Sequence, residues 1–178
     1  MISAENTATQ NVLKIMHVLA WIAFVGLMIE AGAIMVSYIV SCVNPHSSAK
    51  LYMDINWSPL REYDFWQYTM AVSYLIALPV LKALMAYWVI QILSDINLSN
   101  PFTSSVAKQI ENISYILLTT WIVAVIRNEH YKWLIKRIGD LPFDRDAGEF
   151  LFMAGLVFII SQIFKRGVEI QAENDLTV

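Results

Sequence analysis

Four long apolar stretches divide the sequence, and a polar segment separates each from the next. The predicted spans cover residues 18–43, 68–93, 110–126 and 150–164. A bilayer has a hydrocarbon core roughly 30 Å thick, so a helix needs about 20 apolar residues to cross it. The fourth stretch is short, which calls for thin bilayer, snorkelling side chains or an amphipathic extension. The pattern predicts an all-α protein, an integral membrane bundle of four transmembrane helices with interfacial helical extensions.

The polar links between the spans carry signals of the membrane interface. The first link, residues 44–66, leads into an aromatic cluster that fits an interfacial belt. The members of this cluster are Trp57, Tyr63, Phe65, Trp66 and Tyr68. Thr103 is a predicted N-cap for a helix that begins in the interface and continues into the third span. In residues 127–138 the apolar residues fall on one side of a helix and the basic residues on the other, which predicts an amphipathic helix on the membrane surface that ends at Gly139.

Composition supports the membrane class. Apolar residues make up 57% of the chain and charged residues 15%, against about 45–50% and 25% in soluble domains. The formal net charge of −3 and the lack of a basic cluster argue against direct contact with nucleic acid. The sequence has no internal repeat and no extramembrane stretch long enough for a second domain. Residues 1–178 therefore form one predicted domain with a helical tail over 165–178. We expect a multi-pass protein of a cell membrane, in contact with the lipid bilayer.

Two charged residues, Glu30 and Lys82, lie near the middle of the first two spans. Such a charge costs about 2.5–3.5 kcal/mol at the bilayer centre. Because consecutive spans run antiparallel, both residues reach the same depth, and we predict an intramembrane ion pair. Pro79, one turn before Lys82, cannot donate to the helix ladder and predicts a kink. With Gln162 of the fourth span these residues form a predicted interior cluster.

The pair has two interpretations that the sequence leaves open. A buried pair can be structural, fixing the register of two helices. Alternatively it can act as a ligand clamp, a proton-linked switch or a conformational trigger, because ionisable residues inside membranes are functional-site hypotheses by default.

Small residues predict the faces by which the helices pack. Helices with small residues at the contact can approach closely in a membrane. On the first span a stripe surrounds Glu30: Ala23, Gly26, Ala33, Ser37 and Ser41. On the fourth span Gly148, Gly155 and Gln162 repeat every seven residues. Both stripes are predicted to face protein, and they also permit a homo-oligomer or a larger membrane complex.

The residue types that usually carry out catalysis or bind metals show no recognisable motif in this sequence. The three histidines, His17, His46 and His130, lie in different segments without the spacing of metal ligands. One cysteine, Cys42, cannot form an internal disulfide or a thiolate metal site. No glycine-rich phosphate loop or nucleophile elbow is present. We therefore expect a protein that is not an enzyme and uses no metal or cofactor.

Basic residues predict the orientation of the spans. Fewer of them lie on the side of the two termini than on the opposite side, where residues 127–145 contribute most. The positive-inside rule therefore places both termini outside.

Two segments resemble a known family. Residues 164–178 end in Glu-Asn-Asp-Leu-Thr followed by an aliphatic residue, and this ending is similar to that of the bacterial domain-of-unknown-function family 2975, the YoaS-like four-span membrane proteins. The matching residues are Glu173, Asn174, Asp175, Leu176 and Thr177. Pro101, Phe102 and Thr103 resemble the family's Pro-Phe-(Ser/Thr) turn before the third span. The longer first link and the charged link 127–149 depart from the family pattern.

The resemblance implies a role without implying an activity. Members of the family are uncharacterised and often encoded beside a small helix-turn-helix regulator of the Cro/CI type. The resemblance implies a membrane-bound regulatory or sensing partner of such a regulator, contacted through the C-terminal tail. The tail would then lie in the cytoplasm, opposite to the charge count. Glu169, Glu173 and Asp175 would offer an acidic surface to a basic partner.

Two alternatives remain beside the regulatory role. Small multidrug exporters also have four spans and one essential glutamate in the first, so the chain resembles a small ion-coupled transporter in this respect. A lysine at the depth of Glu30 would neutralise that glutamate and argues against proton coupling. The second alternative is an accessory subunit of a membrane complex.

Overall fold

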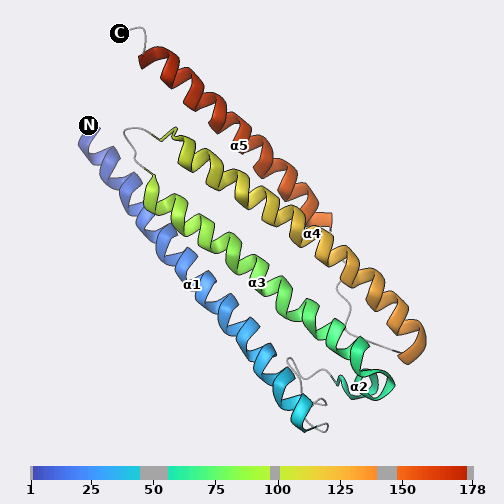
Figure 1. Cartoon of the computed structure of the whole chain (residues 1–178). Helices are drawn as coiled ribbons and strands as arrows, with labels where there is room; N and C mark the ends of the chain where they lie inside the picture. The colour runs from blue at the N-terminus through green and yellow to red at the C-terminus, as the bar shows by residue number, and fades with distance from the viewer. Residues whose placement is uncertain (1, 45–55, 97–100, 140–147, 176–178) are drawn as a thin grey trace.

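The computed structural model describes residues 2–44, 56–96, 101–139 and 148–175 (Figure 1). Within these ranges the chain forms helices and no strand. The helices in chain order are α1 (Ile2–Val43), α2 (Ser58–Tyr63), α3 (Phe65–Asp95), α4 (Ser104–Ile138) and α5 (Gly148–Asp175). The all-α prediction is confirmed.

Four of these helices are long and apolar enough to cross a membrane. The candidate spans are Thr9–Val43, Phe65–Asp95, Ser104–Ile138 and Gly148–Glu173. They correspond to the four predicted spans but are longer, because the interfacial segments continue as parts of the same helices. The predicted surface segment 127–138, for example, forms the last turns of α4. The protein is therefore a four-helix membrane protein.

Local capping sets the ends of two long helices. The Asp64 side chain accepts a hydrogen bond from the backbone N–H of Gln67 at 2.9 Å at the start of α3. Thr103 caps α4 in the same way, accepting from the N–H of Val106 at 3.3 Å. At the other end of α4, Gly139 has φ +98°, a conformation that glycine adopts without strain. The predicted cap at Thr103 and the predicted end at Gly139 are confirmed.

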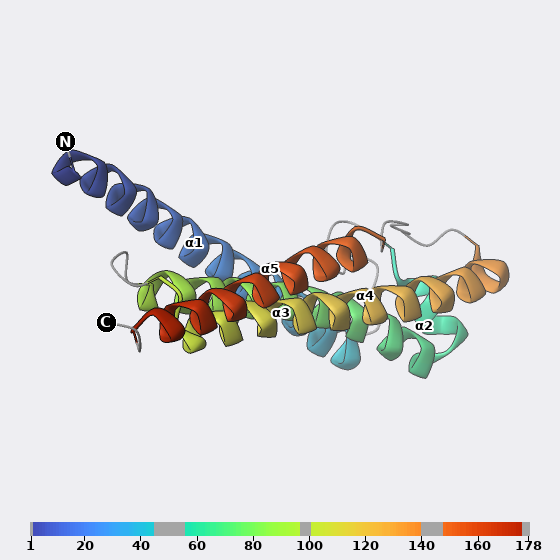
Figure 2. The ribbon, with the colours of Figure 1, turned by 90° about the horizontal axis from the view of Figure 1, so that it is seen from above.

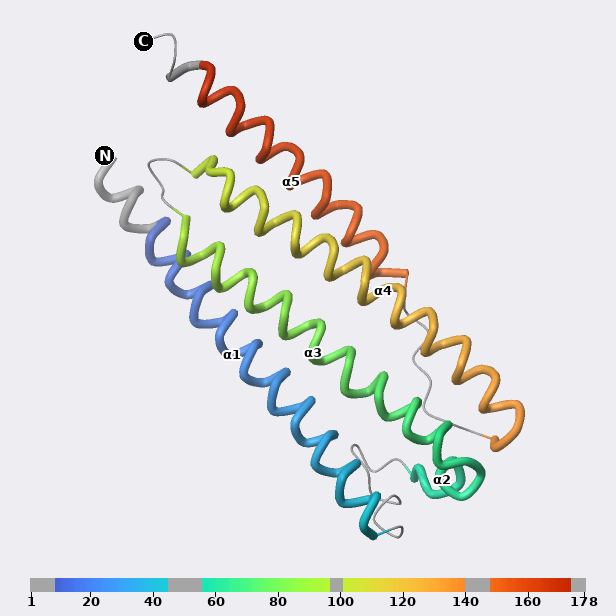
Figure 3. The backbone as a smooth tube through the Cα atoms, viewed as in Figure 1, coloured from blue at the N-terminus to red at the C-terminus, as the bar shows by residue number. Residues whose placement is uncertain are grey.

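The long helices run antiparallel, side by side and in chain order (Figures 1 and 3). α1 packs on α3, α3 on α4, and α4 on α5. Among the described residues the backbone of α1 approaches neither α4 nor α5, so the bundle is an open row. Figure 2 shows the N-terminal part of α1 diverging from the other helices. Exposed apolar side chains such as Val18, Ile22 and Ile29 cover α1, and a bilayer would bury them.

The two ends of the row differ. Both termini, the end of α3 and the start of α4 lie at one end, which we call the terminal end (Figure 1). α2 packs on α3 and α4 at the opposite end, which we call the α2 end. The largest cluster of buried side chains gathers at the α2 end: Ile34, Trp57, Leu60, Tyr68, Ala71, Val72, Tyr131 and Leu134. The core of the protein therefore lies at the α2 end.

Hydrogen bonds connect three helices within this core. The hydroxyl groups of Ser41 and Tyr68 lie 2.7 Å apart. The Tyr131 hydroxyl donates to the carbonyl of Ala71 at 3.0 Å. Of the aromatic residues predicted as an interfacial belt, Trp57 and Tyr68 are fully buried here, whereas Tyr63, Phe65 and Trp66 are exposed. The belt prediction is corrected for the first two, because Trp57 packs against Tyr131 of α4 and Tyr68 against Ser41 of α1.

The predicted packing stripe of α1 needs the same kind of correction. The face that contacts α3 follows Ala31, Ile34, Tyr38 and Ser41, spaced three or four residues apart as in coiled coils. Gly26 and Ala33 are exposed, and a Cβ atom added at Gly26 would meet nothing within 4 Å. Of the stripe, Ser37 is half-buried and Ser41 is buried.

On α5 the predicted face also lies beside the real one. Ala154 and Ser161 are the buried positions, whereas Gly148, Gly155 and Gln162 are exposed. One residue corresponds to a rotation of about 100° around a helix. The small residues of α5 therefore border the contact with α4 and leave part of their surface open.

Candidate functional site

No ion pair joins Glu30 to Lys82. The three ion pairs between described residues are Lys132–Glu129, Lys165–Glu111 and Arg166–Glu169. Lys82 is exposed, and its Nζ atom lies 5.8 Å from the ring centroid of Phe150 in the first turn of α5. Glu30 is half-buried on α1. The structure thus gives Lys82 an aromatic neighbour in place of the predicted carboxylate.

The other members of the predicted interior cluster lie apart as well. Pro79 is buried within α3, which continues as one helix from Phe65 to Asp95. The exposed Gln162 donates from Nε2 to the hydroxyl of its chain neighbour Ser161 at 3.3 Å. The open row explains the separation, because α5 and α1 lie at opposite edges. The cluster remains a prediction from the sequence without a hydrogen bond or ion pair among its four described residues.

A double-mutant cycle on Glu30→Gln and Lys82→Met tests whether the two groups interact. With the separate surroundings seen here, we expect the losses in free energy of unfolding to add within about 0.5 kcal/mol. Unfolding of the detergent-solubilised variants by sodium dodecyl sulfate measures these losses. A coupling free energy well above that value would show that Glu30 and Lys82 interact, as predicted from the sequence.

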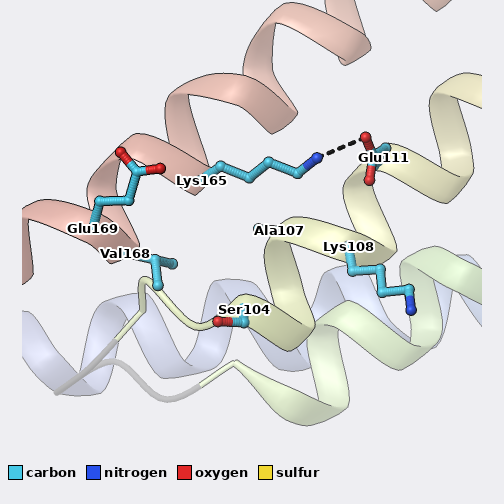
Figure 4. Close-up of a pocket in the computed structure, with 7 residues that line it drawn as sticks. All are labelled: Ser104, Ala107, Lys108, Glu111, Lys165, Val168 and Glu169. Atoms are coloured by element: carbon cyan, nitrogen blue, oxygen red, sulfur yellow. Dashed lines mark hydrogen bonds and ion pairs between the residues drawn. The ribbon is translucent and has the colours of Figure 1, made fainter. Parts of the chain in front are cut away.

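Among the described residues, the ion pair that joins two helices lies toward the terminal end, between α4 and α5. Capping by Thr103 starts α4, and Ser104, Lys108 and Glu111 then follow at intervals of four and three residues. From α5, Lys165 extends across the gap, with its Nζ atom 2.7 Å from Oε1 of Glu111 (Figure 4). This ion pair connects residues 54 positions apart in the sequence.

Two further interactions and a cavity lie beside this ion pair. Tyr115 donates from its hydroxyl to Oε1 of Glu111 at 3.3 Å. Arg166 donates to Oε2 of Glu169 at 2.6 Å on the exposed side of α5. A cavity of about 430 Å³ lies between the two helices, lined by Ser104, Ala107, Lys108, Glu111, Lys165, Val168 and Glu169 (Figure 4). The arrangement offers side chains of both charges at the edge of the apolar region.

An aromatic contact brings the two family-like motifs together. The Phe102 ring lies 5.3 Å, centroid to centroid, from the ring of Phe164 on α5. A Cβ atom added at Gly167 would lie 2.6 Å from Cδ1 of Phe102, so a larger residue there would displace the ring. The turn before α4 thus holds α5 where the tail begins. Both motifs were recognised in the sequence, but no local signal predicted that the Phe102 ring would pack against Gly167.

The closing motif itself is described only in part. Glu173 is exposed near the end of α5. The side chains of Asn174 and Asp175 lie outside the described residues, as do Leu176 and Thr177.

A second double-mutant cycle measures the strength of the Lys165–Glu111 pair. The side chains are 41% and 18% exposed, so solvent weakens the attraction only in part. We expect a coupling of about 0.5–1 kcal/mol between Lys165→Gln and Glu111→Gln. The control pair Lys132–Glu129 is 54% and 66% exposed on one helix face, and its coupling is expected near 0.3 kcal/mol. Equal couplings would show that the pair between the helices is no more than a surface contact.

Comparison with known proteins identifies the family. No match was found among curated proteins or among solved structures. The family model described as protein of unknown function (DUF2975) matches residues 43–178, which include α2 to α5 and both motif segments. That match covers well over half of the chain and confirms the resemblance found in the sequence. The chain therefore belongs to the DUF2975 family.

Proposed function

We propose that the protein is a membrane-bound regulatory or sensing partner of a small helix-turn-helix regulator, which contacts the C-terminal part of α5. One observation carries the proposal: α5 continues past its last apolar turns as one helix to Asp175, anchored on α4 by Lys165 and by the Phe102 ring. Residues beyond the anchor are thus presented on a pre-ordered helix, which lowers the entropy cost of binding a partner.

Charge supports the same proposal. Glu169, which pairs with Arg166, and Glu173 are exposed on this segment of α5. DNA-binding proteins carry basic surfaces, and an acidic helix attracts a basic partner and steers its association. The family resemblance adds the regulator as the kind of partner. In the proposed topology both termini, which lie at the same end in Figure 1, face the cytoplasm of a bacterial cell, and the protein acts without catalysis.

Purification from the native host in mild detergent tests the proposal, with mass spectrometry of the proteins that co-purify. We expect a helix-turn-helix regulator with the full chain and none with a variant that lacks residues 171–178. The double variant Glu169→Gln/Glu173→Gln should weaken recovery, while Glu129→Gln, an exposed acid on α4, should not. Two results would exclude this role: recovery of the regulator in equal amounts with and without residues 171–178, or recovery of membrane subunits alone. The second result would favour an accessory subunit of a membrane complex.

An ion-coupled transporter is the second proposal. The objection from the sequence was neutralisation of Glu30 by Lys82, and the structure shows no such ion pair. Purified protein in liposomes should then move a cationic substrate along a pH gradient. Transport should stop in Glu30→Gln. Transport by the glutamine variant would remove Glu30 as the coupling group.

A further inference from the structure

Two cavities lie between α4 and α5. Besides the polar cavity, a second one of about 280 Å³ lies between the same helices, lined by Tyr115, Leu118, Leu151, Gly155 and Phe158 among others. The α4 residues lining the two cavities include Ser104, Lys108, Glu111, Tyr115 and Leu118, spaced alternately four and three apart. On α5 the same spacing relates Leu151, Gly155, Phe158, Gln162, Lys165 and Glu169.

Residues with this spacing lie on one strip of a helix. The two cavities therefore follow one line along the α4–α5 contact, and we call this line the groove. Tyr115 connects them directly, since its ring lines the apolar cavity and its hydroxyl donates to Glu111 in the polar one.

The polarity of the groove changes along its length. The end near the start of α4 carries a hydroxyl and charged groups, whereas the stretch toward the start of α5 is almost wholly apolar. At 1.5 Å per residue the strip from Lys165 to Leu151 is about 21 Å long. Half of a bilayer, with its head-group region included, is roughly 20–22 Å thick. The groove therefore has the length and the polarity gradient of one lipid in one leaflet.

The charges of the polar end indicate the kind of head group. Glu111 is paired with Lys165, and Glu169 with Arg166. Lys108 is exposed and takes part in no ion pair between described residues. It attracts the Glu111 carboxylate one turn away, but that carboxylate is paired with Lys165, so the Lys108 ammonium can bind a ligand. In Figure 4 it points away from Lys165, and a lysine side chain is long and flexible enough to turn to a phosphate. Ser104 and the first turn of α4 add hydrogen-bond donors that favour an anion.

We propose that this groove binds a phospholipid, with the phosphate at Ser104 and Lys108 and one acyl chain along Tyr115, Leu118 and Gly155. Charge favours a lipid over a second copy of the chain. Copies inserted in the same direction place equal residues at equal depth, so pairing through this strip would bring Lys108 close to the Lys108 of the other copy. Such like charges repel. This site would also explain why a glycine is exposed at position 155, because the missing side chain leaves room for the acyl chain.

Native mass spectrometry of the detergent-solubilised full chain tests the apolar half of the site, with dioleoylphosphatidylglycerol as the added lipid. Gly155→Leu adds a side chain of four carbon atoms; if it displaces about two methylene groups of the acyl chain, lipid retention falls about tenfold. Gly26→Leu is the matched control: a Cβ atom at either glycine meets nothing within 4 Å, and Gly26 lies on α1, outside the groove. Equal loss in both variants would overturn the proposal.

The polar half has its own variants, which do not alter packing. Lys108→Gln should lower retention about fivefold, and Lys14→Gln, an exposed lysine of α1, should leave it unchanged. The wild-type protein should retain dioleoylglycerol, which lacks the phosphate, far more weakly. Equal retention of both lipids, or a dimer that Gly155→Leu dissociates while bound lipid is unaffected, would overturn the proposal. The regulator partner proposed above does not enter these measurements.

Discussion

Replacement of Trp57 by alanine is expected to lower the free energy of unfolding by about 3–5 kcal/mol, the range for deleting a large buried aromatic side chain. Trp57 is 0% exposed and belongs to the core cluster at the α2 end. Its ring lies 6.3 Å, centroid to centroid, from the ring of Tyr131 on α4. Because α2 begins at the next residue and buries Leu60 in the same cluster, the change would loosen the contact of α2 with α3 and α4.

Trp66 provides the matched control, because it has the same side chain, lies nine positions later and is 76% exposed. Trp66→Ala should cost less than about 1 kcal/mol, as is usual for exposed positions. Unfolding by sodium dodecyl sulfate, followed by far-ultraviolet circular dichroism, measures both losses without relying on tryptophan fluorescence. Equal losses would mean that both rings occupy the interfacial belt predicted from the sequence, and that the α2 end lacks the core described above.

The second large effect is expected at Gly167, where even alanine should destabilise the protein by about 1–3 kcal/mol, the usual cost of overpacking. The added Cβ atom would lie 2.6 Å from the Phe102 ring. Phe102 is 39% exposed, so its ring can turn outward, but it would then leave Phe164 and release the start of the tail. Hydrogen exchange of the amides of residues 168–173 should therefore become faster in Gly167→Ala.

Gly155→Ala is the control on the same helix. A Cβ atom at Gly155 meets nothing within 4 Å, so the usual gain of about 0.5–1 kcal/mol for alanine over glycine in a helix should appear. The two substitutions are thus expected to change stability in opposite directions. A gain at both positions would show that Phe102 does not hold α5. If the tail acts as proposed, Gly167→Ala should also reduce recovery of the regulator.

The sequence by itself determined the features that depend on local chemistry. Hydropathy summed over about 20 residues found the four spans, and the caps at Thr103 and Gly139 set the limits of α4. The closing residues and the turn at Pro101 identified the family. Each of these properties belongs to a single segment, so it can be recognised without knowing the neighbours of that segment in space.

Only the tertiary structure decided which surfaces meet. A membrane helix such as α1 is apolar on all sides, so its periodicity does not separate the side that faces protein from the side that faces lipid. The stripes predicted through Gly26 and Gly155 consequently lay about one residue from the true contacts. The same reason explains three contacts that the sequence did not predict. Trp57 lies in the core and not in the interfacial belt, Lys82 lies beside Phe150, and Phe102 packs against Gly167. Each depends on a partner distant in the sequence, which helix packing alone brings into contact.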